Sequence, residues 1–191
     1  SSDLCAVRLQ PEVEMLTRRG QMYAGKIAAH VSAGRVLDVG AAAGFILKGF
    51  VSNGWNGEGI EPNAAMAEFG RRELGLSIEQ GSLESFETTQ SYDLVSMIQV
   101  AAHFYNAKSA FEKAHNLLKP NGLLLVETWD RDSMLARMFG KNWHEYSPPT
   151  VLHWFSKRGL TQFLDRAGFD RIDGGRPPKK ISGGHVRSLL K

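Results

Sequence analysis

The stretch Arg35-Val-Leu-Asp-Val-Gly-Ala-Ala-Ala-Gly-Phe-Ile-Leu-Lys48 constrains the fold of this chain more than any other. Its residues 36–39 are mostly β-branched or apolar, which is typical of a short buried strand. Gly40 and Gly44 frame a turn of small residues, and the apolar residues after them recur with helical spacing until Asn53-Gly54. A strand, a glycine turn and a helix direct backbone N–H groups and a helix N-terminus at a polar or charged ligand. We therefore expect a ligand site at this turn, because a side chain on either glycine would block close approach.

Two acidic residues accompany the turn. Asp38 lies at the end of a hydrophobic strand, where a carboxylate is costly unless it is hydrogen-bonded or paired. We interpret it as an acid that orders the glycine loop or receives a cation, and a turn or helix-cap acid is the alternative. Glu61 ends a second predicted strand, Gly57–Glu61, roughly 20 residues beyond the first glycine, where nucleotide-binding βαβ units place the acid that binds ribose hydroxyls.

The pattern Asp38-x-Gly40-x-Ala42-x-Gly44, followed by Glu61, resembles the cofactor site of class I S-adenosylmethionine-dependent methyltransferases. The usual motif of that family has a glycine in place of Ala42, so we expect a slightly filled loop that keeps its site. A nicotinamide-type loop would have the spacing Gly-x-Gly-x-x-Gly, which this loop does not supply. The resemblance implies that Asp38 orders the loop and meets the cationic amino end of S-adenosylmethionine, while Glu61 binds the ribose hydroxyls.

The resemblance also implies contacts beyond the loop. After the third predicted strand, Ser77–Gly81, the family often has an acid that faces the adenine amino group. This chain has Ser82 and Leu83 there. A serine hydroxyl can accept the same hydrogen bond, and a simple turn serine is the alternative. The residues that we expect at the cofactor are Asp38, Gly40, Ala42, Gly44, Phe45, Glu61, Pro62, Ser82, Leu83 and Gln99.

Strands and helices alternate along the chain. The predicted strands are 36–39, 57–61, 77–81, 92–100, 123–129 and 169–172. The predicted helices after the one that follows Gly44 are 63–74, 106–118 and 156–167. This alternation predicts an α/β fold with a doubly wound, mostly parallel sheet, which is the Rossmann-like class I methyltransferase fold that the resemblance implies. Such sheets bind ligands at the carboxyl ends of their strands, where Asp38, Glu61, Ser82 and Gln99 all fall.

A length of 191 residues suits one domain with flanking segments. Residues 1–34 carry a broken helical stripe, so we predict an N-terminal helical extension that starts near Pro11 and is interrupted at Gly20. Residues 35–176 would form the methyltransferase domain. Residues 177–191 would form a basic tail, for which a solvated segment is a better interpretation than a nucleic-acid-binding surface.

The residues best placed for chemistry follow the fourth strand. Gln99-Val-Ala-Ala-His103 resembles the His-Val-Leu-Glu-His segment of the ubiquinone-biosynthesis O-methyltransferases. The resemblance implies that Gln99 lines the cofactor. Ala102 lacks the carboxylate of that segment, so no metal-assisted or acidic role carries over to it. His103 matches the last histidine and is the candidate catalytic base for an oxygen acceptor, whereas a histidine that caps the next helix is the alternative.

Residues 130–155 form an aromatic segment between the fifth strand and the next helix. The part from Gly140 to Ser156 is similar to a segment of the same family, with Thr150-Val151 in place of its Glu-His pair. Aromatic residues at such density usually belong to a core. Because this segment lies beside the open face of the site, we favour a lid over the substrate. His144 and His153 are not distinguished from surface histidines by the pattern.

Composition narrows the classes of function. The net charge of +3 is weak for a nucleic-acid-binding surface, and no apolar run approaches the ~20 residues of a membrane span. The single cysteine, Cys5, excludes an internal disulfide framework and a metal cluster, and it suits a reducing cytoplasm.

We therefore predict a cytoplasmic enzyme that transfers a methyl group from S-adenosylmethionine to a small molecule, such as a quinone, lipid or sugar precursor, without a metal or a nucleic-acid partner. The alternative is a non-catalytic protein of the same fold that binds the cofactor or a protein partner. A nicotinamide-dependent oxidoreductase is disfavoured by the spacing of the loop glycines.

Overall fold

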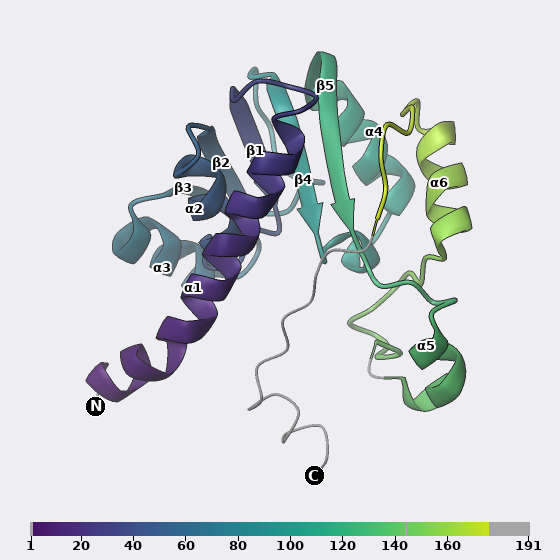
Figure 1. Cartoon of the computed structure of the whole chain (residues 1–191), viewed down its shortest axis with the longest axis horizontal. Coiled ribbons are helices and arrows are strands. Elements are labelled where there is room, and N and C mark those ends of the chain that lie inside the picture. Colours follow the sequence, from purple (N-terminus) through teal and green to yellow (C-terminus); the bar gives the residue numbers. More distant parts are fainter. Residues whose placement is uncertain (1, 144, 176–191) are drawn as a thin grey trace.

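A single parallel sheet forms the centre of the computed structural model (Figure 1), which describes residues 2–143 and 145–175, with side chains from residue 12 onward. The expected basic tail 177–191 and His144 lie outside the described residues. The strands are β1 (Arg35–Val39), β2 (Asn56–Glu61), β3 (Ser77–Gln80), β4 (Tyr92–Ile98) and β5 (Leu118–Glu127), in the spatial order β3-β2-β1-β4-β5. The predicted doubly wound α/β fold is confirmed, and its strand order reverses at β1, where such sheets bind ligands.

Helices cover both faces of this sheet. They are α1 (Ser2–Ile27), α2 (Phe45–Val51), α3 (Ala64–Leu74), α4 (Ala107–Leu117), α5 (Met134–Phe139) and α6 (Lys157–Arg166), with 3₁₀ turns η1 (Ala101–His103) and η2 (Gly140–Asn142). Val36 and Leu94 face the core beneath α1, α2 and α3, whereas Leu37 and Val95 face the core beneath α4 and α6. Strand residues thus alternate between two apolar layers. No helix in the described part of the chain is long and apolar enough to cross a membrane.

Capping residues explain where the helices begin and end. Asn63 accepts hydrogen bonds from two backbone N–H groups at the start of α3, including that of Ala65 (3.0 Å), and Gly75 ends the helix with a left-handed φ of 65°. Asn106 and Ser156 cap α4 and α6 in the same way. These bounds agree with the sequence prediction.

The predicted sixth strand at residues 169–172 is wrong, because this segment forms no strand. Within residues 2–143 and 145–175, β5 pairs with β4 alone. The ring of Phe169 instead packs against that of His115 on α4, with 5.2 Å between their centroids, and Ile172 is exposed. An apolar run becomes a strand only where a partner supplies the backbone ladder.

Other strand ends also differ from the prediction, and β5 ends at Glu127 rather than at residue 129. β4 ends at Ile98 rather than at residue 100, because Gln99 has a left-handed φ of 61°. β5 begins at Leu118 rather than at residue 123, so residues 119–122 are part of an irregular strand. Asn121, with a φ of 63°, lies in this irregular stretch, where the pairing with β4 shifts register.

The expected start near Pro11 and break at Gly20 are both wrong, because α1 continues from Ser2 to Ile27. Gly20 lies where α1 meets Gly49 of α2. An added Cβ on Gly20 would lie 2.1 Å from the carbonyl oxygen of Ile46, and one on Gly49 would lie 2.7 Å from the Cα of Gly20. The two glycines therefore serve close helix packing, which holds α1 against α2 and beside the glycine turn.

We expect Gly20→Ala to destabilise the protein, although alanine favours a helix by ~1 kcal/mol over glycine. The new Cβ would meet backbone atoms of α2, so α1 must shift, at a cost of about 1–3 kcal/mol. The control is Gly25→Ala on the same helix, where an added Cβ meets nothing within 4 Å and stability should rise by about 0.5–1 kcal/mol. Urea unfolding measures both variants, and equal stabilisation would contradict the packing of α1 on α2.

Candidate functional site

The turn between β1 and α2 adopts left-handed backbone conformations at three residues. Their φ angles are 70° at Gly40, 49° at Ala42 and 83° at Gly44. For Ala42 this conformation costs about 1–2 kcal/mol, and the residue is exposed. A Cβ on Gly40 would lie 2.7 Å from Val100 Cγ2. The loop thus has left-handed residues at both glycines and at Ala42, its middle position.

Asp38 is buried beside this loop, with 3% of its surface exposed. It pairs in register with Ser96 of β4, whose hydroxyl donates a hydrogen bond to Asp38 Oδ1. Burial raises the pKa of Asp38 to about 7, although the Ser96 hydrogen bond lowers it, and the charge of Glu61 raises it further. A cation bound at this carboxylate would favour its ionised form.

Glu61 connects the glycine loop to the next helix. Its Oε2 accepts a hydrogen bond from the N–H of Ala42, and its Oε1 accepts one from the N–H of Asn63, both at 2.8 Å. Each carboxylate oxygen can accept a second hydrogen bond. Glu61 can therefore hold the loop in place and still bind the hydroxyl groups of a ligand.

A cavity of about 190 Å³ opens between the glycine loop, the end of β4 and α1. It is lined by Leu16, Arg19, Asp38, Gly40, Ala41, Ala42, Ala43, Phe45, Ile46, Ile98 and Gln99. Because ligand pockets usually measure ~300 Å³ or more, this cavity suits one end of a nucleotide-sized ligand. The sequence analysis did not identify Leu16 and Arg19, because no local signal indicates where α1 docks.

The structure brings five of the expected cofactor residues together in this lining: Asp38, Gly40, Ala42, Phe45 and Gln99. The other five lie outside it. Glu61 ends β2, the exposed Pro62 follows it, and Gly44 is the N-cap of α2. The Ser82 hydroxyl lies 3.3 Å from that of Ser85 within a local turn, and Leu83 is buried in the core beneath α4.

A buried acid that the sequence analysis did not single out lies at the end of β5. Glu127 accepts hydrogen bonds from the Arg19 guanidinium, the Tyr23 hydroxyl and the Gln99 side-chain amide, the last at 2.7 Å. The backbone N–H of Gln99 also donates to the Glu127 carbonyl at 2.7 Å, which supports the left-handed conformation of Gln99. Glu127 thereby joins α1, β4 and β5 beside the cavity.

His103 lies in η1, just after β4, and its side chain is exposed. Its Nδ1 is 2.8 Å from the carbonyl oxygen of Thr150. Because a carbonyl only accepts, Nδ1 carries the proton and Nε2 keeps a lone pair that can receive one. His153 differs, since its Nε2 donates to the Phe104 carbonyl at 2.9 Å. His103 does not line the 190 Å³ cavity.

The aromatic segment 130–155 has a buried and an exposed side. Trp143 and Val151 are buried, while Met134, Met138 and Phe139 of α5 each expose more than half of their surface. The backbone at 152 and 153 is attached to η1, because both N–H groups donate to the carbonyl of residue 102. The segment therefore combines core residues with exposed apolar side chains on α5, and its end at residues 150–153 contacts η1 and His103.

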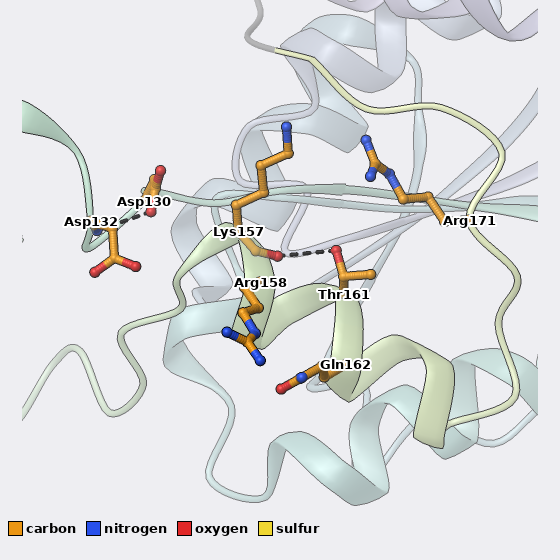
Figure 2. Close-up of a pocket in the computed structure, with 7 residues that line it drawn as sticks. All are labelled: Asp130, Asp132, Lys157, Arg158, Thr161, Gln162 and Arg171. Atoms are coloured by element: carbon orange, nitrogen blue, oxygen red, sulfur yellow. Dashed lines mark hydrogen bonds between the residues drawn. The ribbon is translucent and has the colours of Figure 1, made fainter.

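A larger open hollow of about 450 Å³ lies beside α6 (Figure 2). It is lined by Asp130, Asp132, Lys157, Arg158, Thr161, Gln162 and Arg171, and Figure 2 shows the hydrogen bond from Thr161 to the Lys157 carbonyl. None of the expected site residues lines it. We assign the candidate site to the smaller cavity, because the buried carboxylate of Asp38 and the left-handed loop residues Gly40 and Ala42 all line it. No group of three or more metal-binding side chains occurs among the residues that the structure describes.

The chain is similar to known methyltransferases. A family model described as a methyltransferase domain matches residues 16–173. The ubiquinone biosynthesis O-methyltransferases of Pasteurella multocida and Histophilus somni are 25% and 27% identical to the chain. These alignments cover 77% and 66% of this chain, and 73% and 64% of the two relatives.

Two solved structures are also similar. An S-adenosylmethionine-dependent methyltransferase from Thermotoga maritima has a TM-score of 0.66 and 24% identity, covering 86% of this chain and 78% of that one. An amino pentose methyltransferase from Micromonospora echinaspora, solved with S-adenosylmethionine bound, has a TM-score of 0.55 and 26% identity, covering 60% and 51%.

The pKa of Asp38 makes the stability of the protein depend on pH. Its folded-state pKa of about 7 exceeds its ordinary value of 3.8, so its contribution is fully present below pH 3.8 and is lost as pH rises through 7. We expect the free energy of unfolding to fall by about 1–2 kcal/mol more between pH 5.5 and pH 8 than in Asp38→Asn. Denaturant titrations at both pH values measure this, and parallel profiles of the two proteins would refute it.

Proposed function

The chain belongs to the family of S-adenosylmethionine-dependent methyltransferase domains, and we propose that it transfers the methyl group of that cofactor to a small-molecule acceptor. The observation that carries this proposal is the cavity in which the glycine loop, Asp38 and Arg19 meet. The cofactor supplies a methyl group activated on a sulfonium, so the protein needs to align the acceptor and exclude water.

The residues of the cavity suit the amino-acid end of the cofactor. Asp38 lines the cavity as a buried carboxylate, which complements an ammonium group. Arg19 lines the same cavity from α1 and complements a carboxylate. Opposite charges on the two walls therefore match a zwitterion, and Arg19 joins the proposed cofactor residues although its sequence context gave no signal.

The remaining cofactor residues are proposed to bind the nucleoside end. Glu61 lies at the carboxyl end of β2, where its free lone pairs can accept from the ribose hydroxyls. Ser82 and Leu83 follow β3. Because Ser82 bonds within its own turn and the Leu83 side chain is buried, we expect the adenine to meet the backbone of these residues rather than their side chains.

We propose that His103 accepts a proton from an oxygen acceptor. The Thr150 carbonyl fixes its tautomer, so Nε2 is the basic nitrogen. Segment 130–155 would cover the acceptor, and the exposed apolar side chains of α5 favour an acceptor with an apolar part. The relatives named for ubiquinone biosynthesis point to the same class, and a quinone precursor is the acceptor we favour over a lipid or sugar precursor.

A non-catalytic protein of this family is the second candidate function. It is favoured by Ala102 and Thr150-Val151, which replace acidic and histidine residues of the resembled segments. Methyl transfer that depends on His103 would exclude it. We also propose a cytoplasmic location and no nucleic-acid partner, which are supported by a single cysteine and a net charge of only +3.

We expect Glu61→Ala to weaken binding of S-adenosylhomocysteine by about 1–3 kcal/mol, because a charge-assisted hydrogen bond is lost and the loop N–H of Ala42 loses its acceptor. The control is Glu79→Ala, which removes an exposed acid of the neighbouring strand. Calorimetric titration with S-adenosylhomocysteine, and in parallel with NAD, measures the effect. Unchanged affinity in Glu61→Ala would remove Glu61 from the site, and binding of NAD alone would refute the proposed function.

We expect His103→Ala to lower kcat by about 10²–10⁴-fold, which is the usual contribution of a positioned base. Binding of S-adenosylhomocysteine should stay within a factor of about two, since His103 lies outside the cofactor cavity. Release of S-adenosylhomocysteine with a panel of phenols, catechols, sugars and lipid alcohols identifies an acceptor, and His30→Ala, which removes an exposed histidine, is the control. Full activity of His103→Ala would show that this histidine is not the base.

A further inference from the structure

We propose that Glu127 is a positioning residue that orients Arg19 and Gln99 for the amino-acid end of the cofactor. This inference rests on the proposed function and adds a residue that does not itself line the cavity. Glu127 ends β5, Gln99 follows β4, and Arg19 lies on α1. One carboxylate thus holds two cavity-lining side chains, one from α1 and one from the end of β4.

The hydrogen bonds of Glu127 divide between its two oxygens. Oε1 accepts from Arg19 Nη2 and from Gln99 Nε2, and Oε2 accepts from the Tyr23 hydroxyl. The side chain of Glu127 is only 9% exposed, whereas that of Arg19, which lines the cavity, is 25% exposed. A carboxylate so deeply buried is stable only with such partners, so its position and theirs are determined together.

Glu127 leaves Arg19 with donors for a ligand. A guanidinium carries five N–H groups. One donates to Glu127, and Nε donates to the Tyr23 hydroxyl at 3.0 Å. The ring of Tyr23 also lies 5.7 Å from the guanidinium carbon. The other N–H groups have no acceptor among the described residues, and their fixed fork suits a carboxylate.

Glu127 also determines the orientation of the Gln99 side-chain amide, and hence which of its atoms is available to a ligand. Because Gln99 Nε2 donates to Glu127, its Oε1 is the remaining acceptor. Gln99 and Asp38 line the same cavity, so the amide oxygen and the Asp38 carboxylate together can accept from an ammonium group. The cavity then presents donors on the α1 side and acceptors on the sheet side, which is the pattern that a zwitterion requires.

The chain contains a matched control at the opposite end of the sheet. Glu58 accepts hydrogen bonds from the Arg35 guanidinium and from the Tyr92 hydroxyl, the latter at 2.7 Å. The Arg35 guanidinium carbon lies 5.7 Å from the Tyr92 ring, as in the Glu127 cluster. Arg35 and Tyr92 begin their strands, and none of the three residues lines the cofactor cavity. The same cluster of a glutamate, an arginine and a tyrosine thus lies both beside the cavity and away from it.

The test compares two ligands in Glu127→Gln and Glu58→Gln. S-adenosylhomocysteine carries the amino-acid end, and 5′-methylthioadenosine lacks it. In Glu127→Gln we expect the Kd of S-adenosylhomocysteine to rise at least tenfold and that of 5′-methylthioadenosine to change less than twofold. In Glu58→Gln the ratio of the two Kd values should stay that of the wild type. Equal weakening of both ligands in Glu127→Gln would mean a merely structural role, and no change would also overturn the proposal.

Tyr23→Phe provides a milder second variant, because it removes one donor to Glu127 and keeps the ion pair with Arg19. It should raise the Kd of S-adenosylhomocysteine about two- to fivefold and leave that of 5′-methylthioadenosine unchanged. If Glu127→Gln fails to fold, an unchanged ratio in Tyr23→Phe overturns the proposal. If the wild-type protein binds neither compound, the proposed function and this inference are both overturned. If the wild-type protein binds S-adenosylhomocysteine and the variants keep its ratio of Kd values, only the role of Glu127 is overturned.

Discussion

The close approach of α1 and α2 at Gly20 and Gly49 decides what the rest of the molecule can do. A methyl group on either glycine would overlap backbone atoms of the facing helix. Because the helices meet there, the next turns of α1 place Leu16, Arg19 and Tyr23 over the carboxyl ends of β1, β4 and β5. Without this contact the sheet would still form, but the cavity at its ligand-binding edge would lack one wall and the side chain of Arg19.

Three carboxylates at this edge of the sheet have different surroundings, and each surrounding suits a different task. Asp38 is buried with one hydroxyl donor, which leaves its charge available for a cation. Glu61 is partly exposed and shares its oxygens with two backbone N–H groups, so it shapes the loop. Glu127 is buried among three donors and orients its neighbours. The same carboxylate group thus serves binding, loop geometry and positioning, and its partners decide which.

Local patterns predicted most of the fold. The apolar runs, the capping residues Asn63 and Ser156, and Gly75 place strands and helices within a few residues of where the structure has them. Two of the failures arise because a local pattern does not contain its partner. Residues 169–172 look like a strand but find no ladder, and Gly20 looks like a break but is a packing contact.

The sequence by itself determined the fold class, the glycine loop and the acids Asp38 and Glu61, because these follow from short-range periodicity, turn chemistry and fixed spacing. Only the tertiary structure decided that Arg19 lines the cavity, that Glu127 joins α1 to β5, and that the Thr150 carbonyl fixes the tautomer of His103. Arg19 and Glu127 are separated by 108 positions in the chain. Contacts over such separations depend on how helices dock on the sheet, and no local pattern records that docking.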